Sequence, residues 1–182
     1  ALTLVLGVLV ALMGLARTPL LEVAAGWAGL PVQHASVHPA FCIYFAGAFV
    51  CGAAAWMKFR WMPHLGVLAC AAALAAALTL EAPAPVALLF LVMIGFIAFI
   101  VSVYSIGYMA HAHRQGWYWF FLLLTFASLA GIVSTPDMAS MYGYWELMTF
   151  ASYFLVVHEA DRVAFDAGFK YYLMCAGGAL LM

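Results

Sequence analysis

A single carboxylate lies deep within a long, largely apolar stretch of the sequence. Residues 136–157, PDMASMYGYWELMTFASYFLVV, are long enough to cross a bilayer, and Glu146 lies near their midpoint. An acidic side chain at the centre of a membrane helix costs roughly 2.5–3.5 kcal/mol, so such a group faces a helix bundle or a wet cavity and marks an ion path by default. Glu146 is therefore the first candidate for chemistry, as a proton carrier.

The polar side chains near Glu146 follow a helical spacing. Steps of three and four residues place the hydrogen-bonding groups of this stretch on one helix face: Tyr142, Glu146, Thr149 and Tyr153. The hydroxyl groups are suited to support the acid or water beside it. A purely structural alternative is an acid kept neutral by burial and hydrogen-bonded to Tyr142 or to a neighbouring helix.

The composition defines the class of protein that must position this acid. Hydrophobic residues make up 69% of the sequence and charged residues 7%, and the mean hydropathy is +1.12, which excludes a soluble fold. The apolar runs are continuous rather than alternating, so they predict helices and not a membrane barrel. With a net charge of -1 and no cluster of basic residues, a nucleic-acid partner is not expected.

The predicted fold class is all-α, a polytopic transmembrane helix bundle of about seven apolar segments. Ser134 to Asp137 provide a helix cap, a proline for the first turn and an acid at the positive end of the sixth segment. The seventh is cut short by the end of the chain. The predicted segments are 1–16, 39–57, 65–80, 86–109, 117–133, 136–157 and 169 onward.

Basic residues predict the orientation of this bundle. If the chain alternates sides along the seven segments, one side receives five basic residues and the other receives only Arg17. The positive-inside rule makes the richer side cytoplasmic, with cytoplasmic loops at 58–64, 111–116 and 158–168. An inner bacterial membrane is the expected location. The five residues are Lys58, Arg60, Arg114, Arg162 and Lys170.

Histidine and cysteine positions bear on metals and cofactors. The four cysteines show no C-x-x-C spacing, so no metal or disulfide framework is predicted. A haem-binding, cytochrome b-like subunit would need histidines inside the spans, and all six fall at the ends of segments or between them. No cofactor is therefore expected in this chain. The histidines are His34, His38, His64, His111, His113 and His158.

Three motifs resemble a known family. YSIGYM at 104–109, YGYWELMTFASYFLVV at 142–157 and AFDAGFKYYLMCAGGALLM at 164–182 resemble the antiporter-like subunits of respiratory complex I. The same superfamily includes Mrp-type sodium/proton antiporters and membrane-bound hydrogenases. The resemblance covers about residues 84–182, which predicts an incomplete proton-channel core there, preceded by divergent N-terminal helices in residues 1–83.

The resemblance implies specific roles. It makes Glu146 the acid of a first half-channel, paired in the family with a lysine two spans later, which would lie beyond Met182. Lys170 instead matches a basic position where the following helix begins, and His158 is a candidate for proton entry at the surface. The mechanism implied is a switch between protonated and ionised Glu146 as a lysine approaches and withdraws.

The predicted function is proton, and alternatively sodium, translocation within a larger assembly. The chain has neither iron–sulfur spacing nor a nucleotide-binding glycine pattern, so any redox chemistry is expected in partner subunits, and whether the chain is part of an enzyme stays open. The expected partners are other membrane subunits and lipid, with no soluble substrate beyond protons or sodium. The alternative is a structural membrane anchor that binds partner subunits without conducting ions.

Overall fold

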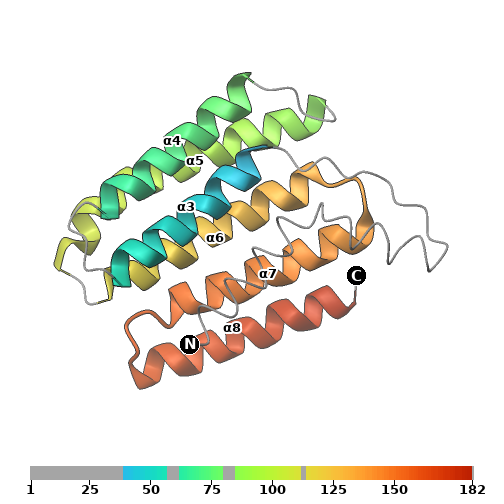
Figure 1. Cartoon of the computed structure of the whole chain (residues 1–182). Helices are drawn as coiled ribbons and strands as arrows, with labels where there is room; N and C mark the ends of the chain where they lie inside the picture. Colours follow the sequence, from blue (N-terminus) through green and yellow to red (C-terminus); the bar gives the residue numbers. More distant parts are fainter. Residues whose placement is uncertain (1–38, 57–61, 80–84, 112–113, 182) are drawn as a thin grey trace, which may run out of the picture. The chain divides into compact units, whose positions relative to one another are not determined.

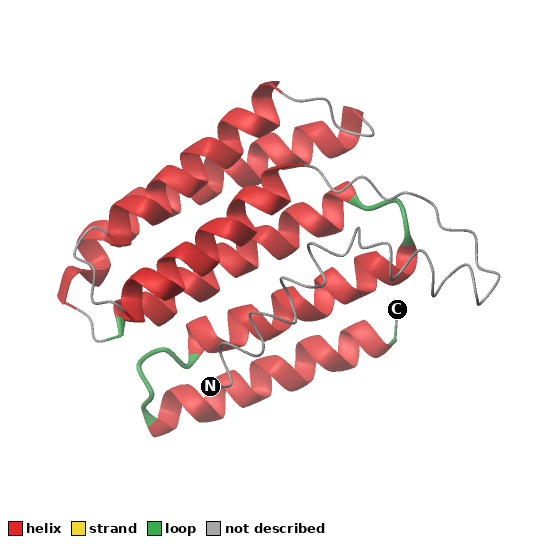
Figure 2. Ribbon diagram, viewed as in Figure 1, coloured by secondary structure: helices red, strands yellow, loops and turns green. Residues whose placement is uncertain are grey.

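The computed structural model describes residues 39–56, 62–79, 85–111 and 114–181, all within the compact unit Ser36–Met182. Throughout these ranges the chain is helical and contains no strand, as Figure 2 shows. The all-α prediction is thereby confirmed for this part of the chain. The elements are α3 (Pro39–Trp56), α4 (Met62–Thr79), α5 (Pro85–Tyr108), a short 3-10 turn η1 (Met109–His111), α6 (Gln115–Ser134), α7 (Met138–Val156) and α8 (Arg162–Leu180).

Helix α6 is the centre of the packing. It contacts α3 and α7 most extensively, α4 packs on α3 and α5, and α8 packs on α7 (Figure 1). Buried residues of α6 are large and apolar, including Trp119, Leu123 and Leu124, each at most 2% exposed. α6 is therefore the element against which the Glu146 helix is positioned.

Close contacts fix α7 on α6. The rings of Phe121 and Phe154 stack with their centroids 4.4 Å apart. Further along the same interface, a Cβ atom on Gly131 would lie 2.7 Å from Cδ1 of Tyr144, so only glycine fits there. Small residues that permit such close approach hold membrane helices together, because lipid supplies no hydrophobic drive between them.

Three helices, α4, α5 and α6, are long and apolar enough to cross a membrane, and Pro39–Ala54 forms a shorter apolar helix. α7 has 19 residues but does not belong to this group, because Glu146 and neighbouring tyrosine, tryptophan and serine residues lower its hydropathy. Arg162, Asp166 and Lys170 do the same for α8. The number of seven membrane segments therefore stays a prediction, and segment 1–16 lies outside the described residues.

Several predicted boundaries need correction. The loop predicted at 158–168 is a short turn, because α8 begins at Arg162 rather than at residue 169. Asp161 caps this helix, its carboxylate accepting the backbone N–H of Arg162 at 2.7 Å. The loop predicted at 58–64 ends earlier, since α4 begins at Met62, and that at 111–116 ends at the start of α6. Of the charged residues at these positions, Arg162 lies in the first turn of α8 and is exposed.

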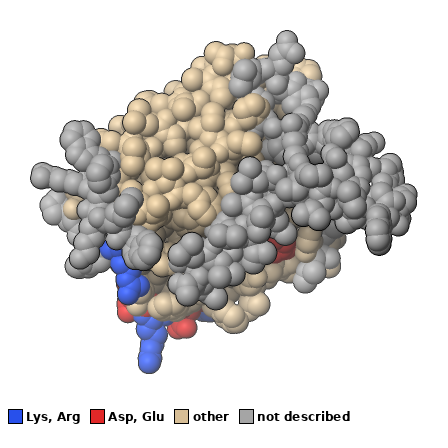
Figure 3. All heavy atoms as spheres, viewed as in Figure 1, with Lys and Arg blue, Asp and Glu red and all other residues tan. Residues whose placement is uncertain are grey.

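The charged ends of the last helices lie together. Arg114 precedes α6 and Arg162 begins α8, and the ring of Tyr118 near the start of α6 contacts that of His158 after α7. Figure 3 shows blue and red side chains gathered at one end of this view. The two described arginines therefore share one end of the helices, as the alternation of segments predicts. The division of the chain at residue 84 stays a prediction.

Candidate functional site

The helix that carries Glu146 begins at a well-defined cap. Asp137 is the N-cap of α7, and its carboxylate accepts hydrogen bonds from the backbone N–H and the hydroxyl of Ser140, both at 2.9 Å. The bond from the backbone N–H holds the pKa of Asp137 below its ordinary value. The prediction of an acid at the start of this helix is thus confirmed for Asp137. Ser134 does not cap α7 but ends α6, and its hydroxyl donates to the carbonyl of Ala130 at 2.6 Å.

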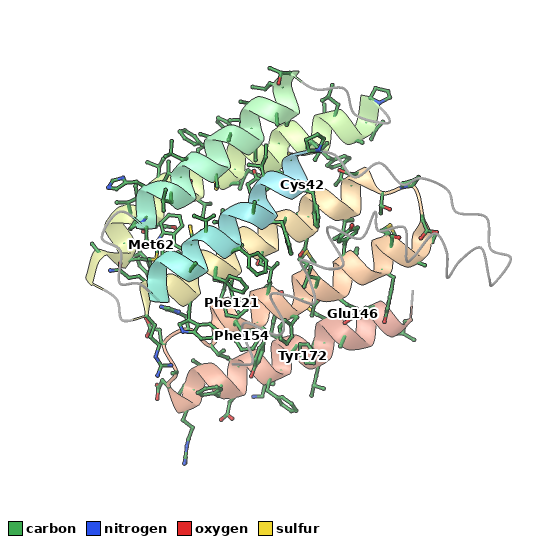
Figure 4. The ribbon with its side chains drawn as sticks, in the orientation of Figure 1. Cys42, Met62, Phe121, Glu146, Phe154 and Tyr172 are labelled. Carbon is green, nitrogen blue, oxygen red and sulfur yellow. The ribbon has the colours of Figure 1, made fainter. Side chains whose placement is uncertain are left out.

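Glu146 lies near the middle of α7, is half-buried, and extends toward α8 in Figure 4. The side chain of Tyr142, one turn earlier, interacts with its carboxylate. In the part of the chain that the structure describes, no ion pair joins Glu146 to Arg114, Arg162 or Lys170. The acid is therefore supported by its own helix and has no cationic partner there.

The two other members of the predicted stripe have different surroundings. Thr149 is fully buried, and its hydroxyl donates to the carbonyl of Trp145 at 3.1 Å, within its own helix. Tyr153 packs edge-on against Tyr172 of α8, with ring centroids 5.8 Å apart. Because the stripe occupies one face of α7, this contact directs that face, including Glu146, toward α8.

Lys170 lies in the middle of α8 rather than at its beginning, and it is exposed. Its level along α7 follows from the bond between Ser152 Oγ and Tyr171 Oη, 2.9 Å, which places Lys170 beside Tyr153. At a rise of 1.5 Å per residue, this is about 10 Å along the axis from Glu146. The structure does not bring Lys170 and Glu146 together.

His158 lies in the turn that follows α7 and is half-buried. It is about 18 Å along the helix axis from Glu146, at the charged end of the bundle. Its imidazole contacts the ring of Tyr118 in α6, with centroids 5.7 Å apart. His158, in the turn after α7, and Glu146, near the middle of that helix, therefore lie too far apart to belong to one pocket.

The packing of α7 against α8 changes along their length. Near the charged end, a Cβ atom on Gly168 would lie 2.5 Å from Val157 Cγ1, so the helices are in close contact. Toward the other end, no described atom outside its own helix backbone lies within 4 Å of a Cβ built on Gly143, Gly177 or Gly178. Among the described residues, these three glycines are therefore not in close contact with a neighbouring helix.

A hollow lies toward this end of the interface. Its volume is about 250 Å³, and its lining is almost entirely apolar. Tyr142, which contacts Glu146, belongs to the lining, so the hollow reaches the neighbourhood of the acid. The lining residues are Met138, Ala139, Met141, Tyr142, Trp145 and Ala179.

Sequence reasoning missed the polar contacts that cross between helices. Ser152 forms a hydrogen bond with Tyr171, and the ring of Tyr172 contacts that of Tyr153. Of these four residues, only Tyr153 was a predicted site residue. Hydroxyl-bearing residues on the facing side of α8 were the available signal. Their pairing needs the helix register, which spacing within one helix does not provide.

Metal ligation has no basis in the described ranges. Within them, no group of three histidine, cysteine, aspartate or glutamate side chains is placed to hold an ion. His34, His38 and His113 lie outside those ranges.

Comparison with known proteins shows what the chain is similar to. A family model described as NADH-Ubiquinone oxidoreductase (complex I), chain 5 N-terminus, matches residues 84–121. The Na(+)/H(+) antiporter subunit A1 of Staphylococcus aureus, in strains JH9, Newman and N315, is 29% identical over 139 residues, which cover 76% of this chain. The chain spans only 16% of the length of these relatives. No solved structure matches the chain.

The chain is similar to the antiporter-like membrane subunits of the complex I and Mrp antiporter superfamily. The resemblance predicted from the three motifs is thereby confirmed. The family-model match takes in α5, with the motif at 104–109, and ends at residue 121, ahead of the Glu146 helix. Together with the apolar helices α4, α5 and α6, this similarity indicates an integral membrane protein.

Proposed function

We propose that this antiporter-like subunit conducts protons through a half-channel centred on Glu146. The observation that carries the proposal is a half-buried acid at mid-helix that interacts with a tyrosine of its own helix, and this tyrosine lines a hollow between α7 and α8. Ionisable groups in membrane helices are costly and are retained at ion pathways. An acid without a fixed counter-ion is free to bind and release a proton as its surroundings change.

The mechanism has two states. With no cation nearby, Glu146 holds a proton, because the charged form is poorly solvated in a membrane interior. When a lysine on a neighbouring helix approaches, the ionised form is favoured and the proton leaves. This lysine is expected in sequence beyond Met182. Tyr142 orients the carboxylate, and water that enters the hollow transiently connects it to the surface.

The other candidate residues support this exchange. Thr149 and Tyr153 continue the polar face of α7 from Glu146 toward the charged end. His158 accepts protons from water at that end, and Lys170 supplies positive charge midway along α8. The path from His158 to Glu146 is long enough that intervening water or further helices must complete it.

The chain acts within a larger membrane assembly. Its family comprises subunits of multi-subunit complexes, so other membrane subunits are its partners and any redox cofactor resides in them. The relatives are named as Na(+)/H(+) antiporter subunits, which makes sodium the second candidate ion. The expected location is a bacterial inner membrane with the Arg114 and Arg162 end cytoplasmic.

The test is Glu146→Gln in the complete protein, assembled with its partners and reconstituted into vesicles. Glutamine keeps the shape but does not titrate, so proton transport is expected to fall roughly tenfold or more. Proton movement is followed with a pH-sensitive dye inside the vesicles, and repetition in sodium-free buffer separates proton from sodium transport.

Glu159→Gln is the matched control, because it makes the same change at an exposed position in the turn after α7. It is expected to leave transport unchanged. If Glu146→Gln assembles normally and transports at the rate of the unmodified protein, the chain is a membrane anchor and the half-channel proposal is wrong.

A further inference from the structure

Side chains from three helical segments meet at the charged end of the bundle, and of these only His158 belongs to the proposed proton path. The three side chains are Ser105 in α5, Tyr118 in α6 and His158 after α7. Ser105 and Tyr118 lie 13 residues apart and Tyr118 and His158 lie 40 apart, so only the fold brings them together.

The direction of the hydrogen bond follows from the donors available. Ser105 is buried, and its hydroxyl donates to the carbonyl of Val101 at 2.7 Å, which uses its single hydrogen. The 2.8 Å bond between Ser105 Oγ and Tyr118 Oη is therefore donated by the tyrosine. The phenol ring of Tyr118 is thus held in one orientation by α5.

The oriented ring of Tyr118 supports the imidazole of His158. The two rings meet edge to face, with centroids 5.7 Å apart and planes inclined by 66°. Within the described residues the imidazole has neither a hydrogen-bond partner nor an ion-pair partner, so its ring nitrogens stay available to water. His158 also follows the C-terminal end of α7, where the helix dipole favours a cation.

The charges around His158 have both signs and none pairs with it. Tyr108 ends α5 and Arg114 precedes α6, while the turn and the start of α8 contribute acids and one base. The groups of the turn and α8 are Glu159, Asp161, Arg162 and Asp166.

We propose that Tyr118, held by Ser105, is the positioning residue that keeps His158 available as a proton acceptor at the charged end of the bundle. This inference rests on the proposed proton-conducting function. His158 takes a proton from water, forms the imidazolium, and returns the proton to water on the path toward Glu146. Tyr118 and Ser105 stay uncharged and move no proton.

The first experiment measures initial transport rates against pH in reconstituted vesicles of the complete assembly. His158→Ala is expected to lower the rate several-fold at high pH, where protons are scarce, and little at low pH. Tyr118→Leu reproduces this profile, and the double variant is no slower than either single one. Tyr118→Phe keeps the ring and loses only the bond to Ser105, so it rescues part of the rate, and Ser105→Ala matches Tyr118→Phe.

Tyr104→Leu is the matched control, since Tyr104 is an exposed tyrosine of α5 that stacks on Tyr108. It is expected to leave the profile unchanged. An unchanged profile for Tyr118→Leu, or a loss of rate that is equal at every pH, would overturn the positioning role.

A second experiment does not depend on transport. Diethyl pyrocarbonate modifies accessible neutral imidazoles, and mass spectrometry of the digested protein locates the label. At one pH, Tyr118→Leu is expected to lower the labelling rate of His158 several-fold, while labelling of His64 in α4 stays constant. Equal labelling of His158 in both proteins contradicts the inference even if Glu146→Gln abolishes transport. A lowered labelling rate with an unaffected Glu146→Gln variant instead overturns the proposed function alone.

Discussion

The helices around α6 and the pair α7–α8 differ in how much of their side-chain surface is buried. In α6, large apolar residues such as Trp119 and Leu123 are fully buried. In α7, only Thr149 and Ala151 are buried, and Tyr142 of the polar face that includes Glu146 lines a hollow. The comparison indicates that α3 to α6 supply stability, whereas the interface of α7 with α8 is left loose and polar where an ion-handling group needs room to change state.

The largest expected effect tests the stable region. Trp119 is completely buried against α4, where its ring leaves no room for a side chain on Gly66. Trp119→Ala is expected to destabilise the helices by about 3–5 kcal/mol, because it leaves a cavity that the packing cannot fill. Thermal unfolding of the complete protein in detergent measures the change.

Trp119→Phe provides the control for this prediction. The indole N–H of Trp119 is buried without a hydrogen-bond partner, so its removal relieves part of the cost of the smaller ring. A much smaller loss of stability is expected than for alanine. If Trp119→Ala lowers the stability no more than Trp119→Phe does, the region around α6 is not tightly packed.

A smaller effect is expected where α7 meets α8. Ser152→Ala removes the 2.9 Å bond to Tyr171 between the two helices. Interhelical hydrogen bonds in membranes average about 0.6 kcal/mol, so a loss of this size is expected. A double-mutant cycle with Tyr171→Phe isolates the pair, and a coupling above roughly 2 kcal/mol would show that the interface is as firmly held as that around α6.

The smallest effect concerns the cap of α7 and depends on pH. Asp137 has its pKa lowered in the folded protein by the Ser140 N–H, so its contribution is present above the ordinary value of about 3.9 and disappears as the pH falls through the lowered pKa. Asp137→Asn keeps a capping side chain without this dependence. Melting temperatures of the two proteins are expected to differ slightly at neutral pH and to converge in acid, and a constant difference would contradict the cap assignment.

Helix positions followed the hydropathy of the sequence closely in the apolar part and less well at the charged end. The predicted segment 86–109 corresponds to Pro85–Tyr108, since lipid-length apolar runs leave one solution for the backbone. The start of α8 was misplaced, because the charges between Arg162 and Asp166 resemble a solvated loop although a helix accommodates them equally well. The grouping of Tyr142, Glu146, Thr149 and Tyr153 as one functional stripe stays a prediction.

By itself, the sequence determined the class of protein, its resemblance to antiporter-like subunits and the isolated carboxylate of Glu146, because composition, motif order and helical periodicity are properties of the chain taken along its length. Only the tertiary structure decided that the polar face of α7 is directed toward α8, that Lys170 lies about 10 Å along the axis from the acid, and that Tyr118 supports His158. These relations depend on the register and rotation of helices against one another. Packing of large side chains against glycines sets both, and no periodicity within one helix encodes them.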